Sequence, residues 1–246
     1  MNKNKIFILA IFAIVVGFVY SAMLTSCSDD SYLSEYKLDK DVSLVDSTGM
    51  SYSTRSSPYA SKLIYTVPRF YEYDPSDNPN HYNWCAHAAL KSVLKYHGIS
   101  ISMTTLHNYF YANTSSYRNG GRCGDGRFCA NLYDMYLACQ KTNQINLPNS
   151  SYESINSISN FWQRLKDGVD YNKPAIVPST YQCSYGHMYV VVGYQEGANY
   201  NQKYLYLRDV LFENNVSGTF GIYDRMCTAQ EFYNKFSGNQ IFFVRP

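Results

Sequence analysis

The sequence predicts an α+β domain in which N-terminal helices pack on one side of an antiparallel sheet. In the first half of the domain, apolar residues recur at helical spacing, with helix-capping residues at the ends of these segments. In the second half they alternate with polar residues or form short β-branched runs, as in strands. Because helices and strands are segregated along the chain, an α+β arrangement is favoured over an alternating α/β one.

Five helices are expected. They cover Cys85 to Tyr96, Thr105 to Tyr111, Phe128 to Gln140, Ile158 to Asp167 and Ala229 to Phe236. Asn83 is placed to cap the first helix and Thr104 the second, and Ser157 lies near the start of the fourth. His97-Gly98 is a good end for the first helix, and a Gly-rich loop precedes the third.

The expected strands lie mainly after residue 170. They cover Leu63 to Val67, Lys173 to Val177, Met188 to Tyr194, Lys203 to Asp209, Phe220 to Tyr223 and Gln240 to Val244. The run that ends at Tyr194 is apolar and β-branched, which is typical of a buried strand, and the run that ends at Asp209 alternates as a half-buried strand does.

The composition predicts a globular protein and argues against nucleic-acid binding. Of 246 residues, 46% are hydrophobic and 16% are charged, so the chain has enough apolar residues for a core. The net charge is only +2, and no basic run provides the footprint of a nucleic-acid binder. The 26 tyrosines, each with an apolar ring and a polar hydroxyl group, suit a wet or adhesive surface.

Residues 1–27 have the parts of a secretory signal. Two lysines are followed by an unbroken apolar run, Ile6 to Val19, and then by small residues before Cys27. Leu-x-x-Cys resembles a bacterial lipobox, in which Cys27 would be lipidated and become the new N-terminus. The alternative is a membrane anchor that extends to about Leu24, which needs about 20 apolar residues and is weakened by Tyr20.

The chain is therefore expected to be exported and held at the membrane through a lipid anchor at Cys27. Ser28-Asp29-Asp30 resembles the acidic tag that sends some Gram-negative lipoproteins to the cell surface, so the expected location is the outer membrane, facing outward. Residues 28–62 are polar with a Ser-rich patch, which predicts a flexible tether. Residues 63–246 are expected to form one domain with a single core.

Three residues form a pattern that suits nucleophilic catalysis. Cys85 lies in the first turn of a predicted helix, where unpaired N–H groups and the helix dipole favour a thiolate. A nucleophilic cysteine needs a base that is oriented by a third group. His187 starts a buried strand and Asp209 ends the next one, so two adjacent antiparallel strands can bring them together. The alternatives are a small buried cysteine and two hydrogen-bonded structural residues.

The residues around these positions give a more specific resemblance. The segments NWCAHAAL (83–90), GHMYVVVGY (186–194) and LYLRD (205–209) resemble papain-like cysteine peptidases, in particular the bacteriocin-processing-peptidase-like branch. The resemblance spans about residues 63–246 and implies a papain-like fold and a peptide or protein substrate, with no cofactor. The gap of 102 residues between Cys85 and His187 is longer than in transglutaminase-like and cell-wall amidase relatives.

The resemblance also implies a role for each residue. Cys85 would be the nucleophile, His187 would hold it as an ion pair and protonate the leaving amine, and Asp209 would orient His187. The oxyanion hole would use the backbone N–H of Cys85 and a side-chain amide upstream. In the family this amide is usually a Gln about six residues before the cysteine. Here no Gln precedes residue 140, so Asn80 is the candidate, with Asn78 as the other nearby amide.

These departures from the family pattern, together with Ala86-His87 where the family prefers Gly-Pro, motivate a second hypothesis. The protein would then be a catalytically weak papain-like scaffold that acts as a surface binding module. A third hypothesis, an amide hydrolase or transferase acting on cell-wall peptide, shares the three residues but fits their spacing less well. His87 is not expected to be the base, because two residues along a helix is about 200° of rotation and points it away from Cys85.

Five cysteines remain after Cys27 and Cys85. Cys123 and Cys129 flank the Gly-rich loop and are the expected disulfide pair, and disulfides are allowed in an exported protein. Five cannot all pair with one another, so at least one is expected to stay free. No C-x-x-C spacing is present, and no metal site is expected.

Overall fold

The computed structural model describes residues 44–45, 51–52, 59–80, 83–119, 128–184, 186–211 and 224–246. The helices are α2 (Cys85–Tyr96), α3 (Met103–Asn113), α4 (Ser115–Arg118), α5 (Leu132–Lys141), α6 (Ile158–Asp170) and α7 (Ala229–Lys235). The strands are β1 (Leu44–Val45), β2 (Ser51–Tyr52), β3 (Ser61–Leu63), β4 (Ser151–Ser154), β5 (Ala175–Ser179), β6 (His187–Gln195), β7 (Tyr204–Asp209), β8 (Arg225–Thr228) and β9 (Gln240–Phe243). The predicted signal peptide with Cys27, and the strand predicted over residues 220–223, lie outside the described residues. Within the described residues, no helix combines the length and the apolar character that a membrane span requires.

A seven-stranded antiparallel sheet forms the centre of the domain. Six of its strands run in the order β4-β9-β5-β6-β7-β8, and the seventh, β3, pairs with β6. The long strand β6 organises the sheet, because β5 pairs with its first half and β3 pairs with its last residues along the same edge. β7 pairs with the opposite edge of β6. The antiparallel sheet and the preceding helices confirm the predicted α+β class.

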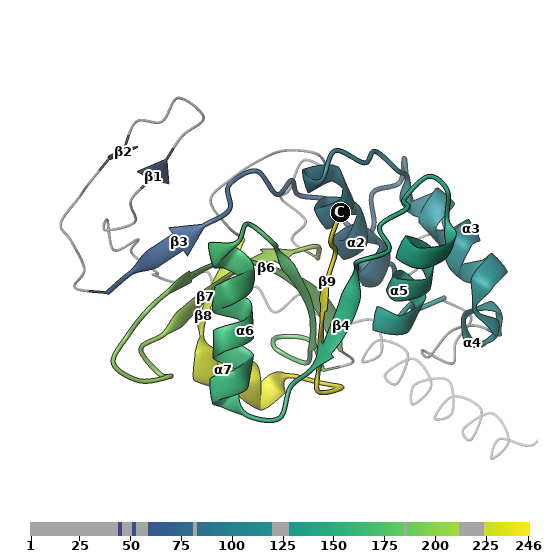
Figure 1. Cartoon of the computed structure of the whole chain (residues 1–246). Helices are drawn as coiled ribbons and strands as arrows, with labels where there is room; N and C mark the ends of the chain where they lie inside the picture. The colour runs from purple at the N-terminus through teal and green to yellow at the C-terminus, as the bar shows by residue number, and fades with distance from the viewer. Residues whose placement is uncertain are drawn as a thin grey trace, which may run out of the picture.

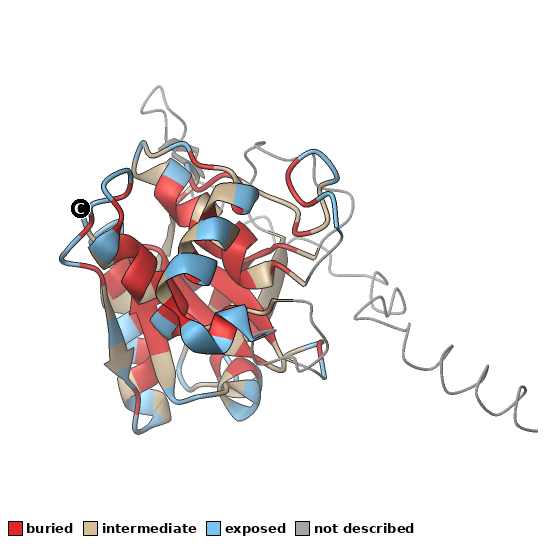
Figure 2. Ribbon diagram, turned by 90° about the vertical axis from the view of Figure 1, so that its right-hand side faces the viewer, coloured by how far each residue is buried: buried red, intermediate tan, exposed pale blue. Residues whose placement is uncertain are grey.

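Helices cover both faces of this sheet, whereas the sequence predicted helices on one side only. α3, α4 and α5 gather around α2, and α6 lies across the strands with α7 near one of its ends (Figure 1). Both α2 and α6 pack against β6. The first eight residues of β6 are all buried, and successive side chains of a strand point to opposite faces, so neither face is open to solvent. Figure 2 shows that buried residues occupy the centre of the domain and that exposed residues lie on the outer sides of the helices.

Local capping determines where the helices begin. α3 starts two residues earlier than predicted, because the Ser102 side chain accepts a hydrogen bond from the Thr105 backbone N–H at 2.9 Å, and Thr104 is therefore not the cap. α5 starts later than predicted, because Asn131 forms a capping box with Asp134. Phe128, where this helix was predicted to start, has a φ of 54° and cannot begin a right-handed helix.

Short strands account for most of the differences in the sheet. The strand predicted over residues 63–67 is instead the three-residue β3. β4 and β8 were not predicted, since each has only four residues and neither has a run of apolar side chains. Both lie at the ends of the sheet order. Short edge strands with polar residues are common because they protect a sheet from pairing with other chains, and they leave little hydrophobic signal in the sequence.

Gly193 allows three strands to approach closely. A Cβ atom at this position would lie 2.7 Å from the Lys62 carbonyl oxygen, 2.7 Å from Leu63 Cδ1 and 2.8 Å from Tyr206 Cδ2. Gly193→Ala is therefore expected to lower the free energy of unfolding by about 1–3 kcal/mol, since backbone and packed side chains must shift. Urea denaturation of both proteins measures the difference. Ser154→Ala, at an exposed strand end, is the control and should change it by less than about 0.5 kcal/mol. Equal stability of Gly193→Ala and the wild type would contradict this packing.

In the helical part of the domain, the buried His87 and the partly buried His107 share one tyrosine hydroxyl group. His87 Nε2 lies 2.8 Å from the Tyr117 hydroxyl oxygen, and the same oxygen lies 2.7 Å from His107 Nδ1. The His87 ring stacks on Trp84, with 4.7 Å between the ring centroids. His87 thus contacts residues of α3 and α4, and the prediction that it points away from Cys85 is consistent with these contacts.

These histidines make the fold sensitive to acid. Burial, together with the charge of His107, places the pKa of His87 well below 6.5, and burial also lowers the pKa of His107. The unfolded chain therefore binds more protons than the folded one below about pH 6.5, so this contribution to stability is present above that pH and is lost as the pH falls. For each extra proton bound by the unfolded chain, the free energy of unfolding falls by about 1.4 kcal/mol per pH unit as the pH is lowered. His87→Gln, followed by urea denaturation at several pH values, should show a flatter acid slope than the wild type; an identical slope would contradict the prediction.

Candidate active site

Cys85 is the first residue of α2 and is half-buried. The predicted cap is wrong: Trp84 is the N-cap residue and makes no side-chain capping bond, and Asn83 Oδ1 instead accepts a hydrogen bond from the Tyr73 hydroxyl group at 2.8 Å. The first turn of α2 contains no acidic residue. The Cys85 thiol therefore lies at the positive end of the helix dipole, with no acidic residue in the same turn to oppose it.

His187 and Asp209 lie on adjacent strands and are joined directly. His187 is the first residue of β6, and Asp209, the last residue of β7, is the register partner of Tyr189. His187 and Tyr189 are two residues apart and point to the same face, so the side chain of Asp209 meets His187 there. His187 Nε2 lies 2.9 Å from Asp209 Oδ1. Gly186, with a φ of +86°, provides the turn into β6 that other residues rarely adopt.

The other side of the imidazole ring faces Cys85. Cys85 Sγ, a ring nitrogen of His187 and a carboxylate oxygen of Glu72 all lie within 4.8 Å of one another. Because Nε2 is bound to Asp209, Nδ1 is the nitrogen available to the thiol. In the part of the chain that the structure describes, these three residues are also the one group close enough to hold a metal ion.

The electrostatics of the site keep the imidazole ring protonated. Burial acts against a charged His187, but the hydrogen bonds and charges of Asp209 and Cys85 outweigh it and raise the pKa of His187 to about 10. Burial also acts against a charged Asp209, but the hydrogen bond and charge of His187, together with Arg225, hold the pKa of this carboxyl group well below its usual range. The arrangement therefore stabilises an imidazolium between a carboxylate and a thiol.

Arg225 is a site residue that sequence reasoning missed. Its Nε contacts Asp209 Oδ2, and the backbone N–H of Leu211 donates to Asp209 Oδ1 at 3.0 Å. Asp209 is thus held from three directions, since His187 binds it as well. No sequence signal marks Arg225, because its position depends on the pairing of β8 with β7.

A second buried acid supports the same strand. Asp224 Oδ2 accepts a hydrogen bond from the backbone N–H of Asp209 at 2.9 Å. Asp224 also pairs with Arg69 at 2.5 Å, and Arg208 lies 3.7 Å away. Arg208 in turn donates to the Val67 carbonyl oxygen at 3.0 Å. These contacts attach the segment before Cys85 to the end of β7 and β8, so that the two halves of the site keep their relative positions.

Asn80, the predicted oxyanion residue, is exposed, whereas Glu72, which was not predicted, is a buried acid in the site. Asn80 lies in a turn and is exposed to solvent. Asn78 is buried, and its Nδ2 donates to the Glu72 carbonyl oxygen at 2.7 Å. Glu72 is only 2% exposed and lies beside Cys85 and His187. Glu72 was not predicted from the sequence, because a single Glu thirteen residues before the cysteine matches no motif.

The cysteines fall into two groups. Cys129 and Cys183 each take part in a disulfide bond. Cys139 and Cys227 are buried free thiols, which agrees with the prediction that at least one cysteine stays unpaired. Cys123 lies outside the described residues, so its pairing with Cys129 stays a prediction.

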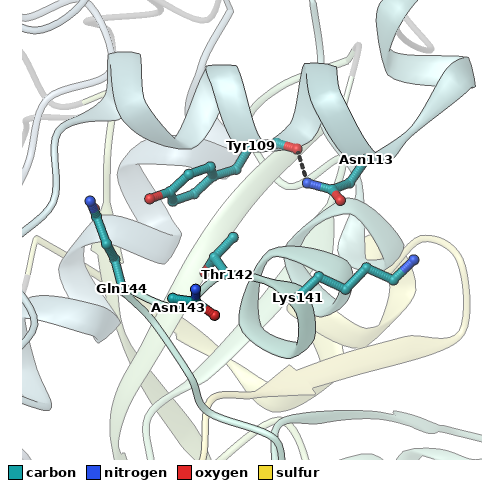
Figure 3. Close-up of a pocket in the computed structure, with 6 residues that line it drawn as sticks. All are labelled: Tyr109, Asn113, Lys141, Thr142, Asn143 and Gln144. Carbon is teal, nitrogen blue, oxygen red and sulfur yellow. Dashed lines mark hydrogen bonds between the residues drawn. The ribbon is translucent and has the colours of Figure 1, made fainter.

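A surface pocket lies apart from this site. It is formed by α3, the last residue of α5 and the segment that follows (Figure 3). Its lining is polar and consists of Tyr109, Asn113, Lys141, Thr142, Asn143 and Gln144. Asn113 Nδ2 donates to the Tyr109 carbonyl oxygen at 2.7 Å within α3, on one side of the pocket. The pocket shares no residue with the Cys85 site, so the chemistry is not located there.

A cysteine at the start of a buried helix, beside a histidine–aspartate pair on neighbouring antiparallel strands, is the arrangement of papain-like cysteine peptidases. The model of the Peptidase_C39 like family matches residues 64–241. The protein therefore belongs to this family of cysteine peptidases, and its substrates are peptides or proteins.

One solved structure with a similar fold is the crystal structure of the peptidase domain of Streptococcus ComA, a bifunctional ABC transporter involved in a quorum-sensing pathway. The two sequences are 19% identical, the match covers 73% of this chain and 99% of that chain, and the TM-score is 0.43. A search of the curated proteins gave no match.

Proposed function

We propose that this protein is an exported, lipid-anchored cysteine peptidase that hydrolyses peptide bonds through Cys85, His187 and Asp209. The observation that carries the proposal is the His187–Asp209 hydrogen bond, which leaves Nδ1 facing the thiol at the start of α2. Each group then has the partner that its role requires.

The reaction follows from these partners. Cys85 transfers its proton to His187, which retains it up to about pH 10, and the thiolate attacks the substrate carbonyl carbon. As the C–N bond breaks, His187 gives the proton to the leaving amine. His187 then takes a proton from water, and the hydroxide attacks the thioester and releases Cys85. Asp209 holds the imidazole ring in place and stabilises its positive charge throughout.

Export and lipidation are supported by the first 30 residues. The lysines, the apolar run and the small residues before Cys27 support cleavage and lipidation at that cysteine, and Asp29 and Asp30 support a location on the outer surface of the outer membrane. The disulfide bonds of Cys129 and Cys183 fit an oxidising compartment. Cys27→Ala should abolish incorporation of a labelled fatty acid, and protease treatment of intact cells should remove the protein only if it faces outward.

The peptidase mechanism is tested by labelling Cys85 with iodoacetamide in the full chain in detergent. Peptide mass spectrometry at a series of pH values measures the rate in the wild type and in His187→Ala. Fast labelling well below the ordinary thiol pKa of about 8.5, lost in His187→Ala, is the expected result. Cys139 and Cys227 are buried and should label slowly in both proteins, and His87→Gln should resemble the wild type. Equal labelling of Cys85 with and without His187 would favour the binding scaffold.

A further inference from the structure

Glu72 is a buried acid whose position in the site is closely determined. Its backbone N–H donates to the Val210 carbonyl oxygen at 2.9 Å, and its carbonyl oxygen accepts from Asn78 Nδ2 at 2.7 Å. The first bond attaches Glu72 beside Asp209, at the end of β7. Its carboxyl group lies within 4.8 Å of both Cys85 Sγ and the ring of His187. A substrate carbonyl group that approaches the thiol would therefore pass close to this carboxyl group.

The carboxyl group of Glu72 lies beside the Tyr73 hydroxyl group, but one of its two oxygen atoms is left unsatisfied within the described residues. Its Oε2 atom is buried and has no hydrogen-bond partner there. Leaving a buried polar atom unpaired is unfavourable because the atom loses its hydration, and such atoms in folded proteins call for an explanation. A neutral carboxylic acid carries one O–H donor. A substrate oxygen that accepts this donor would satisfy the group.

The surroundings of Glu72 favour its neutral form up to near pH 7. Burial raises the pKa of Glu72 to about 7, although the positive charge of His187 and the nearby Tyr73 hydroxyl group act in the opposite direction. The groups that face it are Cys85 from α2, His187 from β6, Asp209 from β7 and Tyr73 from its own segment. Asp209 is negative, as is Cys85 in its reactive form, so both oppose a charge on Glu72.

We propose that Glu72, as a neutral carboxylic acid, is the side-chain donor of the oxyanion hole. This proposal rests on the peptidase function proposed above. It replaces the exposed Asn80 with a residue that is buried, fixed at its backbone and directed at the reacting atoms. A protonated Glu has the same length as Gln and offers an O–H where the amide would offer an N–H.

The step is balanced without any further reactant. The Cys85 sulfur forms a bond to the carbonyl carbon, and the π electrons of the C=O bond move to the oxygen. The resulting oxyanion accepts hydrogen bonds from the backbone N–H of Cys85 and from the O–H of Glu72. When the intermediate collapses, the C–N bond breaks and His187 gives its proton to the amine. Glu72 keeps its own proton, so only its hydrogen bond changes in strength.

This role makes activity depend on pH in a defined direction. An ionised Glu72 has no proton to donate, and its charge repels the oxyanion, so the rate falls as the pH rises through the pKa of Glu72, about 7. His187 does not account for such a fall, because it keeps its proton to about pH 10. The family's Gln does not titrate, and a peptidase that uses it would show no fall from this source.

The experiment compares Glu72→Gln and Glu72→Ala with the wild type, using the full chain and fluorescently labelled casein. On the acid side of pH 7, Glu72→Ala should lower kcat by about 10²–10³-fold with little change in KM, whereas Glu72→Gln should stay within about tenfold of the wild type. On the alkaline side Glu72→Gln should exceed the wild type, because its fall near pH 7 is gone. Glu196→Gln, which changes a partly exposed acid that pairs with Lys203 and is not a residue of the site, is the matched control.

Infrared spectroscopy provides a readout that does not depend on turnover. The carbonyl band of a carboxylic acid should disappear from the wild type as the pH passes about 7 and should be absent from Glu72→Gln. A wild-type rate that is flat across neutral pH, or equal loss in both variants, would overturn the role of Glu72. Casein cleavage that survives Cys85→Ala would instead overturn the peptidase mechanism itself, and the role of Glu72 with it.

Discussion

Cys85→Ala is expected to abolish peptide hydrolysis, with kcat lowered on the order of 10⁶-fold, as when the nucleophile of a serine peptidase is removed. Alanine has no electron pair to attack the carbonyl carbon, and the other free cysteines among the described residues, Cys139 and Cys227, are buried. Cleavage of labelled casein measures the rate. Thermal unfolding should barely change, because Cys85 is small and half-buried at the start of α2.

Cys227→Ala is the matched control for this variant. It removes a free thiol from β8 without touching Cys85, so hydrolysis should continue at the wild-type rate. If Cys85→Ala and Cys227→Ala retained equal activity, the nucleophile would have to be another group. The binding scaffold would be the better account if Cys85 labelled slowly and the wild type cleaved no peptide.

Asp209→Asn is expected to lower kcat by about 10⁴-fold while Cys85 and His187 remain in place. An amide can hold the imidazole ring, but it does not stabilise the positive charge and it favours the wrong tautomer. The pKa of His187 should therefore fall from about 10 toward its ordinary value. Iodoacetamide labelling of Cys85 would detect this fall, because the thiolate would form only at higher pH. Activity within tenfold of the wild type would mean that Asp209 does not orient the base.

The same substitution is expected to destabilise the fold. The pKa of Asp209 is lowered, so its ionised form contributes stability above its ordinary pKa of about 3.9, and this contribution is lost as the pH falls through the folded value. Removing one partner of a buried ion pair costs about 3–5 kcal/mol, here because His187 and Arg225 lose their common counter-charge. Urea denaturation at neutral pH should show this loss. Asp167→Asn, on the outer side of α6, should show almost none.

The parts of the fold with a strong local signal could be predicted. The periodicity of α2 and the apolar run of β6 depend on neighbouring residues, and both elements lie within one residue of their predicted bounds. β4 and β8 could not be predicted, because short polar strands become strands only through their partners β9 and β7. The burial of both faces of β6 likewise depends on α6 returning to the sheet.

By itself, the sequence determined the α+β class and the helix that begins at Cys85. It also determined the strand that begins at His187 and the strand that ends at Asp209. These features rest on residues close together in the chain, whose spacing shows directly which side chains share a face. Only the tertiary structure decided that Glu72 lies beside Cys85 and that Arg225 lies beside Asp209. Those contacts depend on strand register and on how a loop packs against the sheet, and no local pattern of residues encodes either.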